Sequence, residues 1–211
     1  MIVNSSGKNF ECGIDEAGRG SFFGRLYVGA VIFPIDVELD ASLVKDSKMF
    51  YSHNRRKQAR DYVLEKCLYS NVAFVDSSDI DKNGIIPSLM GAMHSAIEGL
   101  EVQPEHILVD GDRFEQYKQI PYDLKIKGDS HYYSIAAASI LAKVAHDEHI
   151  LSMLTEHPEL EEYGLRTNMG YGTKIHRDAL QKKGCSEFHR KTFCEKTLGT
   201  RKPTVIGECL I

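Results

Sequence analysis

Gly13-Ile14-Asp15-Glu16-Ala17-Gly18-Arg19-Gly20 is the stretch of this 211-residue chain that most constrains its fold. From Phe10 to the acidic pair Asp15-Glu16, apolar residues alternate with polar or small ones. This period of two predicts a strand that ends at the acidic pair. After it, the apolar run 26–33 predicts a second strand. Because a Gly-rich turn joins the two strands, we expect them to pair antiparallel.

The rest of the chain alternates between predicted helices and strands. The predicted helices are 52–68 (capped by Ser52), 85–100 (beginning near Pro87), 134–156, and a shorter one capped by Thr173 and closed by Gly184; the further strands are 71–76, 106–110 and 124–127. This order predicts an α/β fold, a mixed five-stranded sheet flanked by helices with a helical C-terminal region. Residues 201–211 fit either a loose tail or a final strand at 205–211.

Length and composition are those of one soluble domain covering residues 1–211, with 42% hydrophobic residues. The five cysteines lie far apart in the sequence, which favours reduced thiols in an intracellular protein over a disulfide framework or a zinc site. The N-terminus lacks the apolar core of a signal peptide, and the longest apolar run is too short to cross a bilayer. We therefore expect a cytoplasmic protein without a membrane partner.

The net charge of −4 does not by itself indicate a nucleic-acid ligand, but the charges are unevenly distributed. Basic residues outnumber acidic ones over 45–60 and over 166–202, whereas 147–162 contains acids and no Lys or Arg. A protein that follows a phosphate backbone needs such a basic face. Ordinary solvated helix faces explain the same pattern equally well, so charge supports a polyanion ligand without establishing it.

Four carboxylates stand at predicted strand ends: Asp15 and Glu16 close the first strand, Asp110 closes 106–110, and Asp129 follows Lys127-Gly128 at another predicted strand end. Acids that meet at one edge of a sheet repel one another unless cations lie between them. Mg²⁺ and Mn²⁺ prefer such oxygen ligands, and two of these ions can stabilise both the attacking water and the leaving oxygen of a phosphodiester. Any one of these acids alone is as well explained by a turn or a helix cap.

Two glycine-flanked residues are candidate substrate contacts. In Gly18-Arg19-Gly20 the glycines allow close approach to a sugar-phosphate, and backbone groups there could bond the 2′-hydroxyl that distinguishes RNA from DNA. In Gly170-Tyr171-Gly172 the tyrosine could stack on a sugar or base. A plain turn and a packed tyrosine explain the same two motifs without a substrate.

Two lysines and two histidines carry weaker signals. Lys48 and Lys143 fit phosphate contacts, although each is also explained as a solvated lysine. His176 and His189 show no metal-ligand spacing and are interpreted as ordinary surface or core histidines.

The chain resembles the type 2 ribonuclease H family, and within it ribonuclease HII, from about Phe10 to Leu198. The resemblance rests on a series of motifs in the family's order: residues 13–20 above, Asp46-Ser47-Lys48, Ile107-Leu108-Val109-Asp110-Gly111, Lys127-Gly128-Asp129, residues 135–144, Gly170-Tyr171-Gly172-Thr173 and His189-Arg190. It implies a ribonuclease H-like core with a helical, substrate-binding C-terminal part from about 158 to 200.

The resemblance also implies a site and a reaction. Asp15, Glu16, Asp110 and Asp129 would be the catalytic carboxylates that bind two divalent ions, Mg²⁺ or Mn²⁺. The residues implied in substrate binding are Gly18, Arg19, Gly20, Lys48, Lys143, Tyr171 and Arg190. The implied reaction is endonucleolytic hydrolysis of the RNA strand of RNA–DNA hybrids, and cleavage 5′ to single ribonucleotides in duplex DNA, giving 3′-hydroxyl and 5′-phosphate ends. Such an enzyme would serve ribonucleotide excision and primer removal.

Departures from the family pattern leave the substrate preference open. Ser21-Phe22-Phe23-Gly24-Arg25 replaces the usual Pro and small residues. Its Phe-Gly part resembles the sister ribonuclease HIII, which prefers longer hybrids, whereas Arg19 favours HII. Met49-Phe50 replaces the commoner Lys-Leu, and His146 stands where Arg is usual. Two different classes of protein also fit parts of the sequence: a non-catalytic nucleic-acid-binding module and an enzyme that acts on small phosphate esters. We expect a monomer, and a replication-clamp partner stays open.

Overall fold

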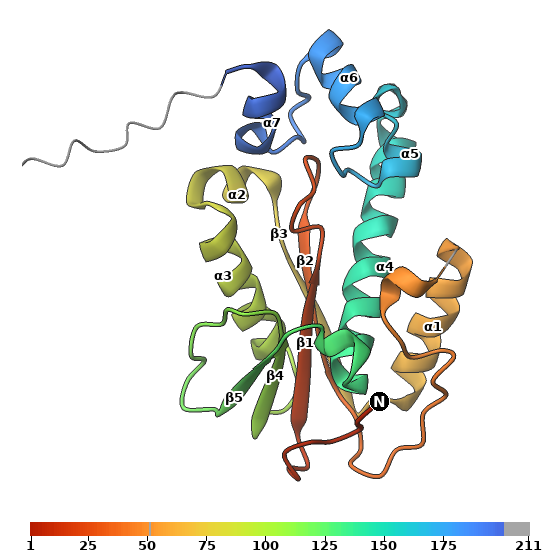
Figure 1. Cartoon of the computed structure of the whole chain (residues 1–211), viewed down its shortest axis with the longest axis vertical. Coiled ribbons are helices and arrows are strands. Elements are labelled where there is room, and N and C mark those ends of the chain that lie inside the picture. The colour runs from red at the N-terminus through yellow and green to blue at the C-terminus, as the bar shows by residue number, and fades with distance from the viewer. Residues whose placement is uncertain (51, 201–211) are drawn as a thin grey trace, which may run out of the picture.

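A mixed five-stranded sheet with the order β3-β2-β1-β4-β5 forms the centre of the computed structural model, which describes residues 1–50 and 52–200 (Figure 1). The strands are β1 (Glu11–Ala17), β2 (Leu26–Ile32), β3 (Tyr69–Val75), β4 (His106–Asp110) and β5 (Tyr122–Lys125). β2 pairs antiparallel with both β1 and β3, whereas β1, β4 and β5 are parallel to one another. The predicted fold class and the antiparallel pairing of the first two strands are confirmed.

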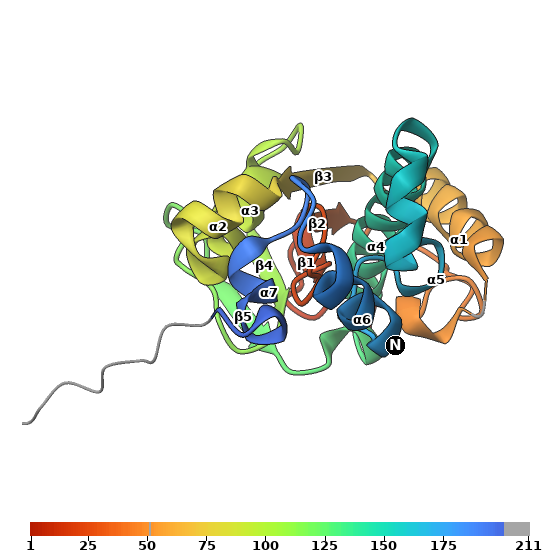
Figure 2. The same cartoon turned by 90° about the horizontal axis from the view of Figure 1, so that it is seen from above.

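Helices cover both faces of this sheet (Figures 1 and 2). The α-helices are α1 (His53–Lys66), α2 (Ser77–Asn83), α3 (Ile85–Glu98), α4 (Tyr133–Glu156), α5 (Leu165–Asn168), α6 (Lys174–Lys183) and α7 (Lys191–Leu198), with 3₁₀ turns η1 (Ser47–Met49), η2 (Gly128–Ser130) and η3 (Pro158–Tyr163). α3 packs on one face, and α4 backed by α1 packs on the other. α5, α6 and α7 gather beyond the end of the sheet at which β1 turns into β2 (Figure 1).

β2 is apolar throughout because both of its faces are buried. Leu26, Val28, Ala30 and Ile32 belong to the core under α3, whereas Val31 belongs to the core under α4 and α1. Fully burying a side chain of this size stabilises the fold by roughly 1.5–3 kcal/mol. A central strand with two covered faces loses the polar alternation that marks a half-exposed strand.

α4 lies directly against the backbone of β1 and β2 at two glycines. A Cβ atom on Gly13 would lie 2.2 Å from the carbonyl carbon of Ser134, and one on Gly29 would lie 2.3 Å from the carbonyl oxygen of Ala138. Gly29 is the partner of Asp15 across the β1–β2 pair. The contact therefore places the middle of α4 at the level of the acidic residues of β1.

Most predicted helices begin and end where the sequence indicated. The Ser52 side chain accepts a hydrogen bond from the Arg55 N–H at the start of α1, and Thr173 and Gly184 bound α6. α2 was not predicted, because this seven-residue helix buries Ile80 alone and so shows no apolar periodicity. Both interpretations of 201–211, a tail or a strand, lie outside the described residues.

Two of the differences between predicted and observed strand ends concern the acidic residues. β1 continues to Ala17, so the acidic pair lies within the strand rather than at its end. β5 lies two residues earlier than 124–127, because Lys127 takes a left-handed conformation with φ of 57° and turns the chain into η2. Ile126, which suggested the later strand, is 77% exposed. Asp129 therefore lies in a 3₁₀ turn, and its prediction at a strand end was wrong.

No helix formed by residues 1–50 and 52–200 combines the length and the apolar character needed to cross a membrane. The cysteines of these segments, Cys12, Cys67, Cys185 and Cys194, are free thiols, as expected.

Replacing Gly29 by alanine should lower the free energy of unfolding by roughly 1–3 kcal/mol, because the new methyl group has to push α4 away from the sheet. Thermal denaturation measures the effect. Gly91→Ala in α3 is the matched control, since a Cβ there meets nothing within 4 Å and alanine favours the helix. Equal melting temperatures for the two variants would contradict the close contact.

Candidate active site

Asp15 and Asp110 lie on neighbouring parallel strands. Ile14 pairs with Val109, so the next residues along β1 and β4 are these two acids. Asp15 is buried, with 4% of its surface exposed. Burial, and then the nearby charges of Glu16 and Asp110, raise the pKa of Asp15 well above its usual range. The fold thus forces carboxylates together in a place where a negative charge is costly.

Asp15 is held by hydrogen bonds from two directions. Its Oδ1 accepts from the Glu16 N–H at 2.7 Å, and the side chain of Ser139 in α4 also bonds to it. The Ser139 Oγ lies 2.9 Å from the Oγ of Ser47. Through these two hydroxyls, Ser47 of the Asp46-Ser47-Lys48 motif is linked to Asp15.

Glu16 has a cationic partner at the entrance of the site. Burial is the main cause that raises its pKa, Arg19 opposes that rise, and Asp110 adds to it. The Arg19 Nη1 lies 3.5 Å from the Glu16 Oε1, and the arginine side chain is 45% exposed. The Glu16 end of the pair is only 15% exposed, so the nearby guanidinium offsets part of the cost of a negative charge there.

Asp110 connects the acids of β1 with the turn that carries Asp129. Its Oδ1 accepts a hydrogen bond from the Gly128 N–H at 2.7 Å. Asp129 follows directly, 4% exposed, and the Ser130 Oγ donates to it at 3.5 Å. The structure therefore brings Asp15, Glu16 and Asp110 into electrostatic contact and places Asp129 beside the residue that Asp110 binds.

This set of donors suits a hard divalent cation. All four groups are carboxylates, and a cation would relieve the repulsion that raises the pKa of Asp15 and Glu16. Within 1–50 and 52–200, no group of three or more His, Cys, Asp or Glu side chains forms a ready-made metal site. The described acids therefore have the donor chemistry of such a site without its preformed geometry.

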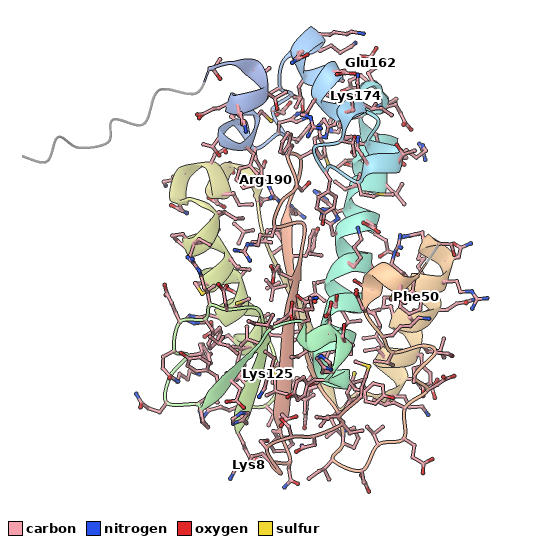
Figure 3. The ribbon with its side chains drawn as sticks, viewed as in Figure 1. Lys8, Phe50, Lys125, Glu162, Lys174 and Arg190 are labelled. Carbon is pink, nitrogen blue, oxygen red and sulfur yellow. The ribbon has the colours of Figure 1, made fainter. Side chains whose placement is uncertain are left out.

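Arg190 holds the backbone of the Gly18-Arg19-Gly20 loop in place. The guanidinium donates to the carbonyl oxygen of Gly18 at 2.7 Å, to that of Arg19 at 3.1 Å and to that of Gly24 at 3.0 Å. Arg190 is completely buried, and burial lowers its pKa to about 10. It lies between the C-terminal helices and the end of the sheet (Figure 3). Its observed contacts are therefore with the loop backbone.

Tyr171 covers the same loop from the side of the C-terminal helices. Its phenol oxygen accepts a hydrogen bond from the Gly18 N–H at 3.2 Å. The Lys143 Nζ lies 5.5 Å from the centre of the tyrosine ring, and the His146 ring lies 5.8 Å from it. The two glycine-flanked motifs predicted to contact substrate, far apart in sequence, thus meet in space.

A polar stripe on α4 underlies these contacts, and its role was missed in the sequence. Ser139, Lys143 and Asp147 recur at intervals of four in the part of the helix that begins with the apolar run 135–138, and this spacing is the signal that could have revealed the stripe. The Lys143 Nζ donates to the Asp147 Oδ1 at 2.7 Å. Burial opposes ionisation of Asp147, but hydrogen bonds and charges from His146 and Lys143 lower its pKa overall.

Three basic residues of the segment 45–60 form ion pairs with acids of α4. Arg56 pairs with Asp147, and Lys57 and Arg60 pair with Glu148, at 2.9–3.2 Å. The bases of α1 thus neutralise the acids of α4, because the two helices pack side by side. Lys48 lies in η1, and its side chain is outside the described part of the chain.

The unusual Ser21-Phe22-Phe23 segment packs against the C-terminal region. Ser21 forms a β-bridge with Tyr171, and Phe23 forms one with His189. Phe23 is fully buried among residues of α4, η3, α6 and α7. These aromatic residues therefore join the loop to the helices that follow Pro158, which gives the sequence departure a packing role.

Comparisons with known proteins point to one family. The family model of ribonuclease HII matches residues 12–196. Ribonuclease HII of Parabacteroides distasonis is 42% identical, over 87% of this chain and 89% of its own length. That of Phocaeicola vulgatus is 40% identical over 90% of each chain.

Solved structures share the fold. Ribonuclease H2 of Pyrococcus horikoshii superposes with a TM-score of 0.73 at 23% identity, covering 90% of this chain and 97% of its own. Ribonuclease HII of Archaeoglobus fulgidus, solved in complex with PCNA, gives 0.70 at 24% identity, with coverage of 92% and 98%. A Bst ribonuclease HIII with Mn²⁺ gives 0.62 at 19% identity, with coverage of 91% and 71%. By its match to the family model and to these relatives, the chain belongs to the ribonuclease HII family and is a ribonuclease H enzyme.

Proposed function

We propose that this enzyme hydrolyses the RNA strand of RNA–DNA hybrids and also cuts 5′ to single ribonucleotides in duplex DNA, leaving 3′-hydroxyl and 5′-phosphate ends. The observation that carries the proposal is the meeting of mutually repelling carboxylates on β1 and β4 with a glycine loop whose backbone is held by Arg190 and Tyr171. The carboxylates are suited to metal-assisted phosphodiester chemistry, and the glycine loop is suited to close contact with a sugar.

Four carboxylates would hold the metal ions: Asp15, Glu16, Asp110 and Asp129. Two divalent ions, Mg²⁺ or Mn²⁺, supply a nucleophilic water and stabilise the leaving oxygen when bound. The Mn²⁺ present in the Bst ribonuclease HIII structure supports this choice of ions. The protein's own part is to keep Asp15 in place through Ser139 and the Glu16 N–H, and Asp110 through the Gly128 N–H.

Substrate recognition would be divided between the loop and the helical part at about 158–200. Gly18, Arg19 and Gly20 would contact the ribonucleotide, since a Cβ at Gly20 meets nothing within 4 Å and leaves the backbone accessible. Tyr171 would pack against the neighbouring sugar. Lys48 and Lys143 would contact phosphates, and Arg190 would act through the loop it holds.

Preference for long hybrids, as in ribonuclease HIII, is the competing hypothesis within the same chemistry. Cleavage of a duplex with one ribonucleotide should be at least as efficient as cleavage of a long hybrid, because the loop that would read a single sugar is rigidly held. Initial rates on both substrates, each in Mg²⁺ and in Mn²⁺, measure this. Cutting of the long hybrid alone would favour ribonuclease HIII-like specificity.

Asp15→Asn should lower kcat by on the order of a thousandfold, because the change removes several kcal/mol of charge stabilisation at the centre of the site. Gel-based cleavage of a duplex with one ribonucleotide checks it, and a chelator should abolish cleavage by the unmodified enzyme. Asp112→Asn is the matched control, since that carboxylate is 69% exposed and should leave the rate unchanged. Full activity of Asp15→Asn would refute the proposed centre.

Asp15→Asn should also raise the melting temperature in the presence of a chelator. Because the pKa of Asp15 is raised in the folded state, the folded protein loses stability as the pH rises above the pKa that this carboxyl has in the unfolded chain. The increase in melting temperature on Asp15→Asn should therefore be larger at pH 8 than at pH 5. Adding Mn²⁺ should stabilise the unmodified enzyme, by about 2.7 kcal/mol at a concentration of 100 times Kd, and should stabilise the variant much less. If the variant and the unmodified enzyme had the same melting temperature at each pH, the repulsion at Asp15 would be contradicted.

A further inference from the structure

His176 and His189 face each other inside the C-terminal region. Their Nε2 atoms lie 3.0 Å apart, and both residues are buried, with 0% and 1% exposed. On the other side of each ring, the His189 Nδ1 meets the N–H and the Oγ of Ser186, at 3.0 and 2.8 Å, and the His176 Nδ1 meets the carbonyl oxygen of Tyr171 at 3.1 Å. The four residues form one continuous chain of hydrogen bonds.

The direction of this chain follows from its first link. A backbone N–H can only donate, so the His189 Nδ1 accepts from Ser186, and the proton of this neutral ring is on Nε2. That Nε2–H donates to the Nε2 of His176, whose own proton is then on Nδ1. The His176 Nδ1–H therefore donates to the Tyr171 carbonyl. One tautomer of each histidine satisfies every contact.

The carbonyl at the end of the chain belongs to a loop that needs support. Met169 and Gly170, directly before Tyr171, both take left-handed conformations with φ of 47° and 80°. A methionine rarely adopts this conformation, so its surroundings have to impose it. The Tyr171 phenol in turn accepts from Gly18, which sets the position of the tyrosine against the substrate loop.

We propose that His176 and His189 are positioning residues that hold Tyr171 against the Gly18-Arg19-Gly20 loop through this directed chain. Arg190, next to His189, holds the carbonyls of Gly18 and Arg19. The dipeptide His189-Arg190 thus anchors both substrate-reading loops from one place. The role in substrate recognition rests on the proposed function, whereas the hydrogen-bond chain itself does not.

A metal site is a poor explanation of the pair. Each Nε2 is used in the contact with the other ring, and the described residues offer no third ligand that would complete a site. Around the pair lie the aromatic rings of Phe22, Phe23 and Tyr163, the last 4.6 Å from the His189 ring, so the histidines are packed as well as bonded.

The chain requires both histidines to be neutral, because a second proton would set two N–H groups against each other. Burial lowers both pKa values, that of His189 to about 3, with help from His176. Tyr163 is the titratable group that faces the pair from η3, and Arg190 follows on the same segment. Below pH 6.5 the two histidines bind more protons in the unfolded protein than in the folded one. The stabilisation that the neutral pair gives the folded state is therefore present above that pH and declines below it.

The tautomers can be observed directly, without substrate or metal. Two-bond ¹H–¹⁵N spectra of the histidine-labelled protein at pH 7.5 should show His176 protonated on Nδ1 and His189 protonated on Nε2. The signals are assigned by loss in single histidine variants. The reverse tautomers, or a charged ring, would contradict the proposed direction of the hydrogen bonds whether or not the protein proves to be a nuclease.

Two substitutions of His176 separate positioning from packing. Asparagine keeps an N–H near the Nδ1 position and can still donate to Tyr171, whereas glutamine keeps an acceptor for His189 but removes that donor. We expect kcat/KM for a duplex with one ribonucleotide to fall by about 10–100-fold in His176→Gln and by less than about threefold in His176→Asn. The fall should lie mainly in KM, because the carboxylates are untouched.

His94→Asn is the matched control, since the His94 Nε2 bonds the carbonyl oxygen of Glu115 away from this site, and its kcat/KM should stay unchanged. Melting temperatures and the Mn²⁺ dependence of cleavage are measured for all variants. Equal losses of kcat/KM in His176→Asn and His176→Gln, with parallel falls in melting temperature, would overturn the positioning role. His176 would then serve only in packing. Absence of cleavage by the unmodified enzyme would refute the proposed function instead, while the tautomer measurement would still decide on the chain.

Discussion

The contact between α4 and the backbone of β1 and β2 is the constraint on which the site depends. Gly13 and Gly29 leave no room for a Cβ atom, so the helix rests on the sheet itself. Ser139 consequently reaches Asp15, and Lys143 and His146, one and nearly two turns later, reach the ring of Tyr171. A displaced α4 would separate these polar groups from the strand that carries the acids.

The acids themselves oppose folding. Asp15 is buried and Glu16 half-buried beside Asp110, and burial and repulsion between the carboxylates raise the pKa of both. Natural proteins keep such costly groups where function requires them. The stability for this arrangement comes from elsewhere, above all from the apolar β2, which is buried on both faces.

The C-terminal helical part and the sheet contribute to one site. Arg190 binds three carbonyl groups of the loop between β1 and β2, and Phe23 of that loop is buried among the C-terminal helices. A buried guanidinium needs such partners, since an unpaired charge would be strongly unfavourable. The loop is therefore shaped by residues more than 160 positions away in the chain.

The sequence by itself determined the elements whose signals are local: the alternating β1, the apolar β2 and β4, the capped α1 and α6, and the grouping of Asp15 with Asp110 at one edge. Only the tertiary structure decided where side chains without a local signal would point. It turned Arg56, Lys57 and Arg60 toward α4, placed Asp129 in a turn, and joined His176 to His189. Hydrophobic period and capping act within a few residues, whereas hydrogen bonds and ion pairs between distant segments exist only after those segments pack.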